Sequence, residues 1–242
     1  MREMPIARTG LKTPRAAAVA GLIFAVLLLA SLTLLFQSVP ARPTDPGEWL
    51  VAQTWKVSLA LNLVPFAGVA FLWFVGVLRD KLGPAEDRLF ATVFLGSGLL
   101  FAGLLFVAAS VLGAILIASA SASADFAETP SYRFARSLVY YLFSIYALKM
   151  AAVFMITAST MIVRTGFTAR WTAIFGYTMA GVILVGSQAF DWTLFLLPLW
   201  VLCVSAAILV EEFRRARVGG PLTQCNGGDQ PSALSISKDI KL

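Results

Sequence analysis

The chain has 242 residues, of which 59% are hydrophobic and only 13% are charged, and its mean hydropathy is +0.82. Soluble domains carry about 25% charged residues, and a water-soluble fold cannot bury so much apolar surface, so the composition excludes a soluble globular protein. The net charge of +6 is explained by attraction to anionic lipid and does not require nucleic acid. The sequence therefore predicts an all-α transmembrane helical bundle.

Apolar runs follow one another along the chain, and each is long enough to cross a bilayer once. The first half contains predicted spans at residues 16–39, 56–78 and 89–118. Cations precede the first run, as in a signal peptide, but its apolar core exceeds the roughly 7 to 15 residues of such a signal, so we expect a retained anchor. Residues 42–53 predict a loop, with Trp49 and Trp55 as interface aromatics.

The charged triplet Arg79-Asp80-Lys81 is expected to end the second span and begin a turn. The third run is long for one crossing, so it either tilts or projects beyond the hydrocarbon. The second half contains predicted spans at residues 137–163, 171–190 and 192–210, and a helix break is expected at Gly219-Gly220-Pro221.

The predicted organisation has three parts. Residues 1–14 form a cytoplasmic leader, residues 15–217 form the six-helix transmembrane domain, and residues 218–242 form a disordered cytoplasmic tail.

The distribution of Lys and Arg predicts the orientation, because cations in short loops are retained on the cytoplasmic side. With six spans and the N-terminus inside, fourteen cations fall on the cytoplasmic side and four on the outside, while Lys149 lies within the fourth span. We therefore expect both ends in the cytoplasm.

Small residues repeat along three of the spans, where they allow helices to approach closely. The repeats are Ala17, Gly21 and Ala25; Gly96, Gly103 and Ser110; and Gly176 and Ala180. Packing within one chain is favoured over oligomerisation, because six spans already offer many internal contacts. A homo-oligomer or a membrane-protein partner stays open.

Residues that carry catalytic or metal chemistry are scarce. The sequence has no histidine, and its two cysteines, Cys203 in the sixth span and Cys225 in the tail, are placed too far apart to pair. No P-loop or Rossmann signature is present. We therefore predict no catalytic residue, no metal site, no cofactor and no nucleic-acid partner.

The most informative polar residue is Lys149, because a charge inside a span costs about 2.5 to 3.5 kcal/mol even on a permissive insertion scale. Together with Tyr146, Asn62 and Gln188 it predicts an outward-facing cationic pocket for an anionic or carbonyl-bearing ligand or for a lipid headgroup. The alternative is that Lys149 snorkels and that its ammonium lies among carbonyls and water without a ligand.

Residues 71–83 (FLWFVGVLRDKLG) and 86–98 (EDRLFATVFLGSG) resemble a group of bacterial polytopic membrane proteins to which no activity is assigned. The resemblance extends over the spans and implies a multi-pass protein of the bacterial cytoplasmic membrane. It transfers no functional residue.

Three classes of function follow. A non-enzymatic membrane component is favoured because it requires no catalytic site. A small transporter comes second, motivated by Lys149, Asn62 and a helix break at Pro65. A lipid-acting membrane enzyme comes last, because no paired carboxylates occur at catalytic spacing.

Overall fold

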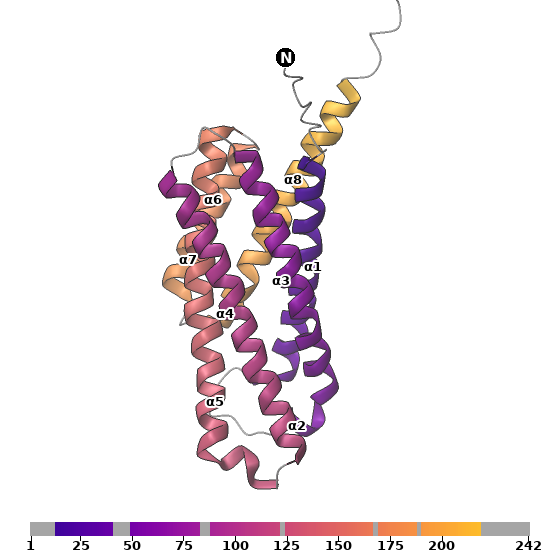
Figure 1. Cartoon of the computed structure of the whole chain (residues 1–242), viewed down its shortest axis with the longest axis vertical. Helices are drawn as coiled ribbons and strands as arrows, with labels where there is room; N and C mark the ends of the chain where they lie inside the picture. The colour runs from indigo at the N-terminus through magenta and orange to yellow at the C-terminus, as the bar shows by residue number, and fades with distance from the viewer. Residues whose placement is uncertain are drawn as a thin grey trace, which may run out of the picture.

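The computed structural model describes residues 13–40, 49–82, 88–121, 124–166, 169–187 and 190–218. Nearly all of these residues are helical, and none is in a strand (Figure 1). The long elements are α1 (Thr13–Ser38), α3 (Thr54–Leu82), α4 (Arg88–Ser121), α5 (Pro130–Tyr140), the π-helix η3 (Tyr141–Ala147), α6 (Leu148–Thr165), α7 (Arg170–Gly186) and α8 (Leu196–Val218). The short elements are α2 (Trp49–Ala52) and the 3-10 helices η2 (Ala124–Glu128) and η4 (Asp191–Phe195).

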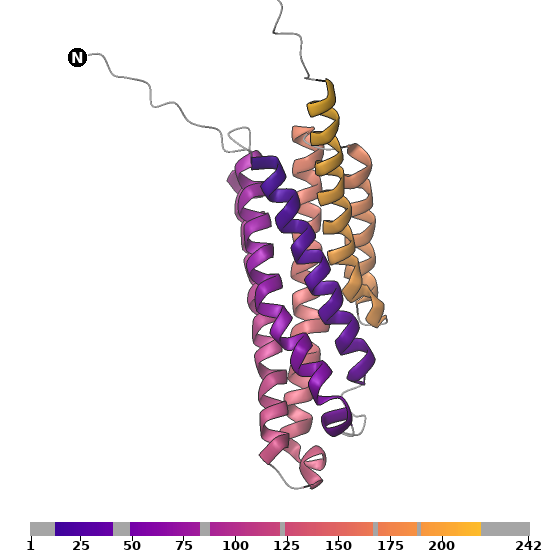
Figure 2. The same cartoon turned by 90° about the vertical axis from the view of Figure 1, so that its right-hand side faces the viewer.

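The long helices run alternately up and down the bundle, and α5, η3 and α6 form one continuous rod (Figures 1 and 2). The start of α1 and the last turn of α8 lie at one end of the bundle, which we call the terminal end. The opposite end, where α2, η2 and the start of α5 lie, is the far end.

The described residues contain five helices long and apolar enough to cross a membrane. They cover Ala16–Ser38, Thr54–Arg79, Leu89–Ser121, Pro130–Thr165 and Asp191–Arg214. These helices confirm the all-α class and the membrane-spanning character. The predicted fifth span corresponds to α7, whose 17 residues measure about 25 Å. α7 is therefore shorter than a hydrocarbon core, which is about 30 Å thick, so the count of six crossings stays a prediction.

The structure confirms one predicted boundary in part and contradicts another. The second span ends at Arg79 as predicted, but the helix α3 continues to Leu82, so the turn expected at the charged triplet does not begin there. Adding a residue to an existing helix costs little, and Arg and Lys are good helix formers, so the triplet does not end it. The fourth helix begins at Pro130, well before residue 137, because the Thr129 side chain accepts a hydrogen bond from the Tyr132 backbone N–H (3.2 Å) and proline suits a first helical turn.

The predicted loop at residues 42–53 contains the short helix α2, and Trp49 is not an interface aromatic. Its indole is buried and donates a hydrogen bond to the Tyr132 hydroxyl (3.1 Å). Burial removes the ring from the lipid surface, whereas Trp55 stays exposed as expected.

The chain ends of the predicted organisation lie largely outside the described residues. These are the leader up to residue 12 and the tail from residue 219. α8 runs to Val218, directly before the glycines at which the break was predicted. α6 ends with Gly166 in the left-handed conformation (φ 62°), which a residue without a side chain adopts readily at a helix C-terminus.

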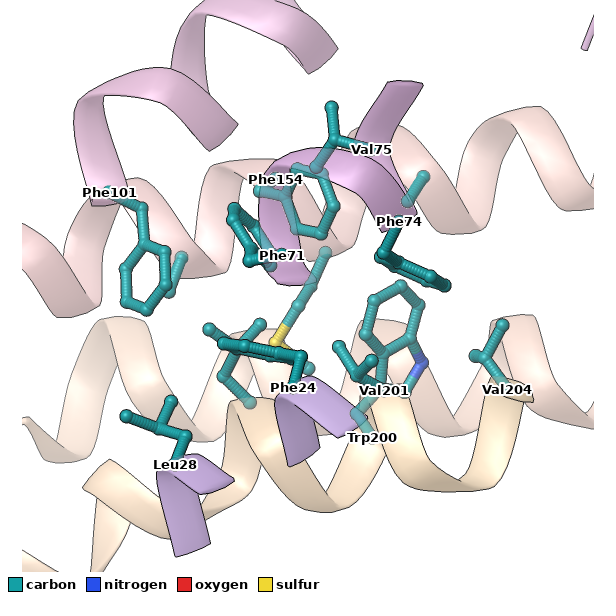
Figure 3. Close-up of a cluster of buried hydrophobic side chains, with 14 of the residues drawn as sticks. Phe24, Leu28, Phe71, Phe74, Val75, Phe101, Phe154, Trp200, Val201 and Val204 are labelled. Atoms are coloured by element: carbon teal, nitrogen blue, oxygen red, sulfur yellow. The ribbon is translucent and has the colours of Figure 1, made fainter. Parts of the chain in front are cut away.

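An aromatic cluster holds the middle of the bundle together (Figure 3). The Phe71 ring lies 4.8 Å from that of Phe24 and 5.2 Å from those of Phe101 and Phe154. Phe154 also contacts Trp200, whose indole donates to the Thr172 carbonyl (3.2 Å). The rings come from five helices, so the cluster fixes their relative positions.

Two of the three small-residue repeats pack inside the chain, as predicted. A Cβ at Gly21 would collide with the Ser205 side chain and lie 2.8 Å from the Phe74 ring, so α1 approaches α3 and α8 closely. A Cβ at Gly176 would collide with Ser159 in the same way.

The repeat on α4 differs from this prediction. Gly103 and Ser110 are exposed, and a Cβ at Gly96 or Gly103 would meet no atom within 4 Å. The reason is the register of α4, which turns its phenylalanines toward the core and this repeat away from it.

The helices differ in length, and this difference divides the bundle. α4 has 34 residues and measures about 51 Å, whereas the turn between α7 and α8 stops well short of the far end (Figures 1 and 2). Beyond that turn, the far end has its own small core. It consists of Trp49, Leu50, Val57, Leu112, Ile115, Leu116 and Tyr132.

Candidate functional site

Lys149 lies near the start of α6 and is half-buried. Its Nζ donates a hydrogen bond to the Leu184 backbone carbonyl (3.2 Å), which belongs to the last turn of α7. Carbonyls in the last turn of a helix lack partners within the helix, and the negative end of the helix dipole favours a cation there. Lys149 therefore caps α7 and joins it to α6.

In the part of the chain that the structure describes, no hydrogen bond joins Lys149 to Asn62 or Tyr146, so the pocket stays a prediction. Asn62 is exposed on α3 and donates to the Ser58 carbonyl of its own helix (2.8 Å). Tyr146 is 57% exposed, and Gln188 lies outside the described residues. Lys149 and Asn62 thus each donate to a different backbone carbonyl.

Pro65 does not interrupt α3, which is continuous from Thr54 to Leu82. The neighbouring Gly68 packs against α4, because a Cβ there would collide with the Phe106 ring. The glycine therefore serves close helix packing.

A cavity lies elsewhere, between the last turns of α1, the last third of α4, the junction of α5 with η3, and η4. It has a volume of about 210 Å³, more than the roughly 150 Å³ of an engineered apolar cavity that binds benzene. Its lining is mostly apolar. The lining residues are Leu32, Leu35, Phe36, Val39, Pro40, Leu112, Arg136, Val139, Tyr140, Phe143, Ser144, Asp191, Leu194 and Phe195. We call it the far-end cavity.

Two smaller cavities, of about 40 and 10 Å³, share Leu32 and Phe143 with the far-end cavity. They extend toward Leu28 and Leu197 in the main core. The three spaces therefore adjoin one another at these two residues.

Arg136 supplies the positive charge of the far-end cavity and is only 6% exposed. One of its terminal nitrogens donates to the Pro40 carbonyl (2.8 Å), and its guanidinium lies 5.3 Å from the centre of the Trp49 ring. Because Trp49 in turn bonds Tyr132, these contacts connect α5 with α2 and with the end of α1. The cation is held in a defined place, as a binding site requires.

Asp191 supplies the negative charge. It is half-buried at the start of η4, next to the exposed aromatic rings of Phe190 and Trp192. Asp191 and Arg136 line the same cavity. The lining thus contains one acidic and one basic side chain.

The π-helix η3 borders the far-end cavity through Phe143 and Ser144. Short π segments inside α-helices occur often at functional sites. Its wider turn changes the direction of successive side chains between α5 and α6, so that Arg136, Tyr140 and Ser144 all line one cavity.

Sequence reasoning missed Arg136, because it counted this residue only as a cation of an outer loop. A signal was present: Tyr132, Arg136 and Tyr140 recur every four residues and therefore share one helical face. The signal did not reveal that Trp49 and Pro40 would face the guanidinium, because those contacts join residues far apart in sequence.

In the described ranges, no group of three or more Cys, Asp or Glu lies close enough to hold a metal ion. No protein-family model, curated protein or solved structure matches the chain. The resemblance of residues 71–98 to bacterial polytopic membrane proteins stays a prediction, and the function has to be argued from the cavity and its residues.

Proposed function

We propose that the chain is a non-enzymatic component of the bacterial cytoplasmic membrane that binds an amphipathic molecule in the far-end cavity. The observation that carries the proposal is the lining of this cavity, in which a long apolar wall meets Arg136 and Asp191. Binding sites for small molecules are typically apolar cavities with a few fixed polar groups.

The proposal includes six crossings with both ends in the cytoplasm, so that the far end faces outward. The five helices able to span a membrane support it. So do the cations at the terminal end, among them Arg88, Arg164 and Arg170, because Lys and Arg are retained on the inner side. In this orientation α7 crosses with its exposed aromatics, Phe190 and Trp192, at the outer interface.

A binding role is favoured over catalysis by the chemistry of the lining. Arg136 keeps its proton at any physiological pH, so it does not act as a base. A lipid-acting enzyme would need a second acid or base beside Asp191, and the cavity lining offers only the weak acid of the Tyr140 hydroxyl.

A transporter with its site at Lys149 is the second candidate. It is less favoured because the ammonium already bonds the Leu184 carbonyl, a contact that explains the charge without a ligand.

Native mass spectrometry of the detergent-purified chain tests the binding role. The wild type is expected to retain one amphipathic molecule, and Leu194→Trp is expected to lose it, because Leu194 lines the far-end cavity. Leu199→Trp is the matched control, since Leu199 is exposed on the surface of α8. Retention by Leu194→Trp, or no bound molecule in the wild type, would contradict the proposal.

A further inference from the structure

We propose that the lipid-facing surface of α6 and α7 at the terminal end binds an anionic phospholipid. Its phosphate lies beside Arg164 and Arg170, and its ester groups lie beside the hydroxyls of Thr160 and Tyr177. The site is at the opposite end of the bundle from the far-end cavity, so the inference goes beyond the proposed function. It is carried by one juxtaposition, in which two exposed cations lie one to two helical turns beyond a pair of hydroxyls on the same surface.

The hydrogen bond between Thr160 and Tyr177 aligns the two helices. The two hydroxyl oxygens lie 2.7 Å apart, and Tyr177 is 38% exposed. Arg164 follows Thr160 by four residues and therefore lies on the same face of α6. Arg170 precedes Tyr177 by seven residues and therefore shares a face of α7 with it. Because the hydrogen bond joins these two faces, both arginines belong to one surface.

Arg164 is held in place in a way that leaves its charge and its donors available. Its guanidinium lies 4.4 Å from the centre of the Phe90 ring, which belongs to the first turn of α4. A guanidinium over a ring uses its flat face, whereas its N–H donors lie around its edge. Within the described ranges, neither Arg164 nor Arg170 forms an ion pair. Both therefore keep the planar donor set that fits phosphate oxygens.

The order of side chains along this surface follows the order of groups in a phospholipid. Arg164 lies about 6 Å beyond Thr160 along α6, and in a phospholipid the ester groups lie directly below the phosphate. Trp171 is 55% exposed beside Arg170, and such rings gather at the headgroup level of a bilayer. Toward the middle of the bundle α7 exposes only apolar surface, with Val182 41% and Val185 88% exposed, which suits acyl chains.

The charges favour an anionic head over a zwitterionic one. An ammonium beside two arginines raises the electrostatic free energy, whereas a phosphatidylglycerol head carries only the negative charge of its phosphate. Two acids of the terminal end, Glu211 and Glu212, lie on α8, which packs mainly against α1. In the proposed orientation, the bound lipid belongs to the cytoplasmic leaflet.

The experiment uses the full chain in phosphatidylcholine nanodiscs that contain a small fraction of one of two photoactivatable lipids with the same diazirine-bearing acyl chain. One is a phosphatidylglycerol and the other is a phosphatidylethanolamine. We expect the phosphatidylglycerol to crosslink to peptides containing Tyr177 or Val182 about fivefold more than the phosphatidylethanolamine, a ratio at the upper end of what one exposed ion pair supplies.

Arg164→Gln and Arg170→Gln are each expected to lower this ratio to about twofold or less, because each removes one partner of the phosphate. Arg214→Gln is the matched control: it removes an exposed cation of the same end, but from α8, so the ratio should keep its wild-type value. All three side chains are exposed, so the variants should fold. Glycerol phosphate, added at the molar concentration of the lipid, offers a phosphate without acyl chains and should leave the crosslink unchanged.

Each other outcome overturns a stated part of the proposal. If Arg214→Gln lowered the ratio as much as Arg164→Gln, the lipid would be attracted by the whole basic end, and the site would be overturned. Equal crosslinking of both lipids in the wild type would overturn the anionic ligand. A crosslink abolished by glycerol phosphate would mean that the site takes a soluble phosphate. None of these results bears on the far-end cavity, which has its own test.

Discussion

Two cations on the rod formed by α5, η3 and α6 illustrate what decides the role of a charged residue. Lys149 is unusual in the sequence because it interrupts an apolar run, yet it bonds a neighbouring backbone carbonyl, that of Leu184. Arg136 looked ordinary in the sequence, yet it is buried beside Trp49 and lines the far-end cavity. The position of a charged residue along the chain predicts the free energy of placing it in the membrane. The residues around it in the fold decide what the charge binds.

Arg136→Ala is expected to destabilise the protein by about 2 to 3 kcal/mol, because it removes a charged hydrogen bond to the Pro40 carbonyl and the contact with the Trp49 ring. Thermal unfolding in detergent measures the loss. Arg133→Ala is the control, since Arg133 is exposed on the same helix and should change stability by less than about 0.5 kcal/mol. Equal effects of the two variants would show that the buried contacts contribute nothing.

Lys149→Met is expected to lower stability by about 1 kcal/mol, since it removes the cation that caps α7. The loss is limited because the variant no longer holds an ammonium inside the bundle. The melting temperature in detergent reports it, and Lys149→Arg should restore most of it. If Lys149→Met kept the stability of the wild type but lost a cellular phenotype, the result would instead favour the predicted ligand pocket at Lys149.

At the scale of the elements, close contact between helices depends on which face a small residue occupies. Gly21 lies where α1 meets Phe74 and Ser205, whereas Gly103 lies on an open face of α4. Both positions belong to repeats that look alike in the sequence. The repeat therefore predicts a small-residue face but does not say what covers that face.

The two glycines make a matched pair of tests. Gly21→Ala is expected to cost about 1 to 3 kcal/mol, because its methyl group would displace Phe74 and Ser205 in a packed interface. Gly103→Ala is expected to stabilise α4 by up to about 1 kcal/mol, because alanine is the better helix former and space is open. Denaturant titration in detergent compares them, and equal losses would contradict the assignment of the two faces.

Chemical crosslinking in native membranes tests whether another protein covers the open face of α4. If a second copy or a membrane partner covers Gly103, Gly103→Leu should reduce the amount of crosslinked complex. If nothing covers it, the crosslinking pattern of the variant should equal that of the wild type.

At the scale of the whole molecule, the unequal helix lengths create the site. α7 and α8 meet at η4 before the bundle ends, while α4 and α5 continue to a second small core around Trp49 and Tyr132. The far-end cavity lies at this change in helix number, where η4 lines it together with α1, α5 and η3. In a bundle whose helices all had the same length, side chains would fill this region.

Cysteine labelling in intact cells tests the proposed topology. In a chain with Cys203→Ala and Cys225→Ser, an impermeant maleimide is expected to label Phe190→Cys at once. It should label Ala169→Cys only after the membrane is permeabilised, because α7 separates the two positions. Protection of both positions in intact cells would mean that α7 does not cross and would reduce the count to five spans.

The sequence by itself determined the all-α class, the membrane-spanning character and most helix positions, because these follow from the length and spacing of apolar runs along the chain. The turn expected at Arg79 is helical, since charged residues do not end a helix whose propagation costs little. The start predicted at residue 137 is wrong, because Thr129 caps a helix that begins at Pro130, before the apolar run. Only the tertiary structure decided that Trp49 is buried, that Lys149 caps α7, and that Arg136 and Asp191 line one cavity. Each of these joins residues from different helices, and a one-dimensional pattern of hydrophobicity contains no information about which helix faces which.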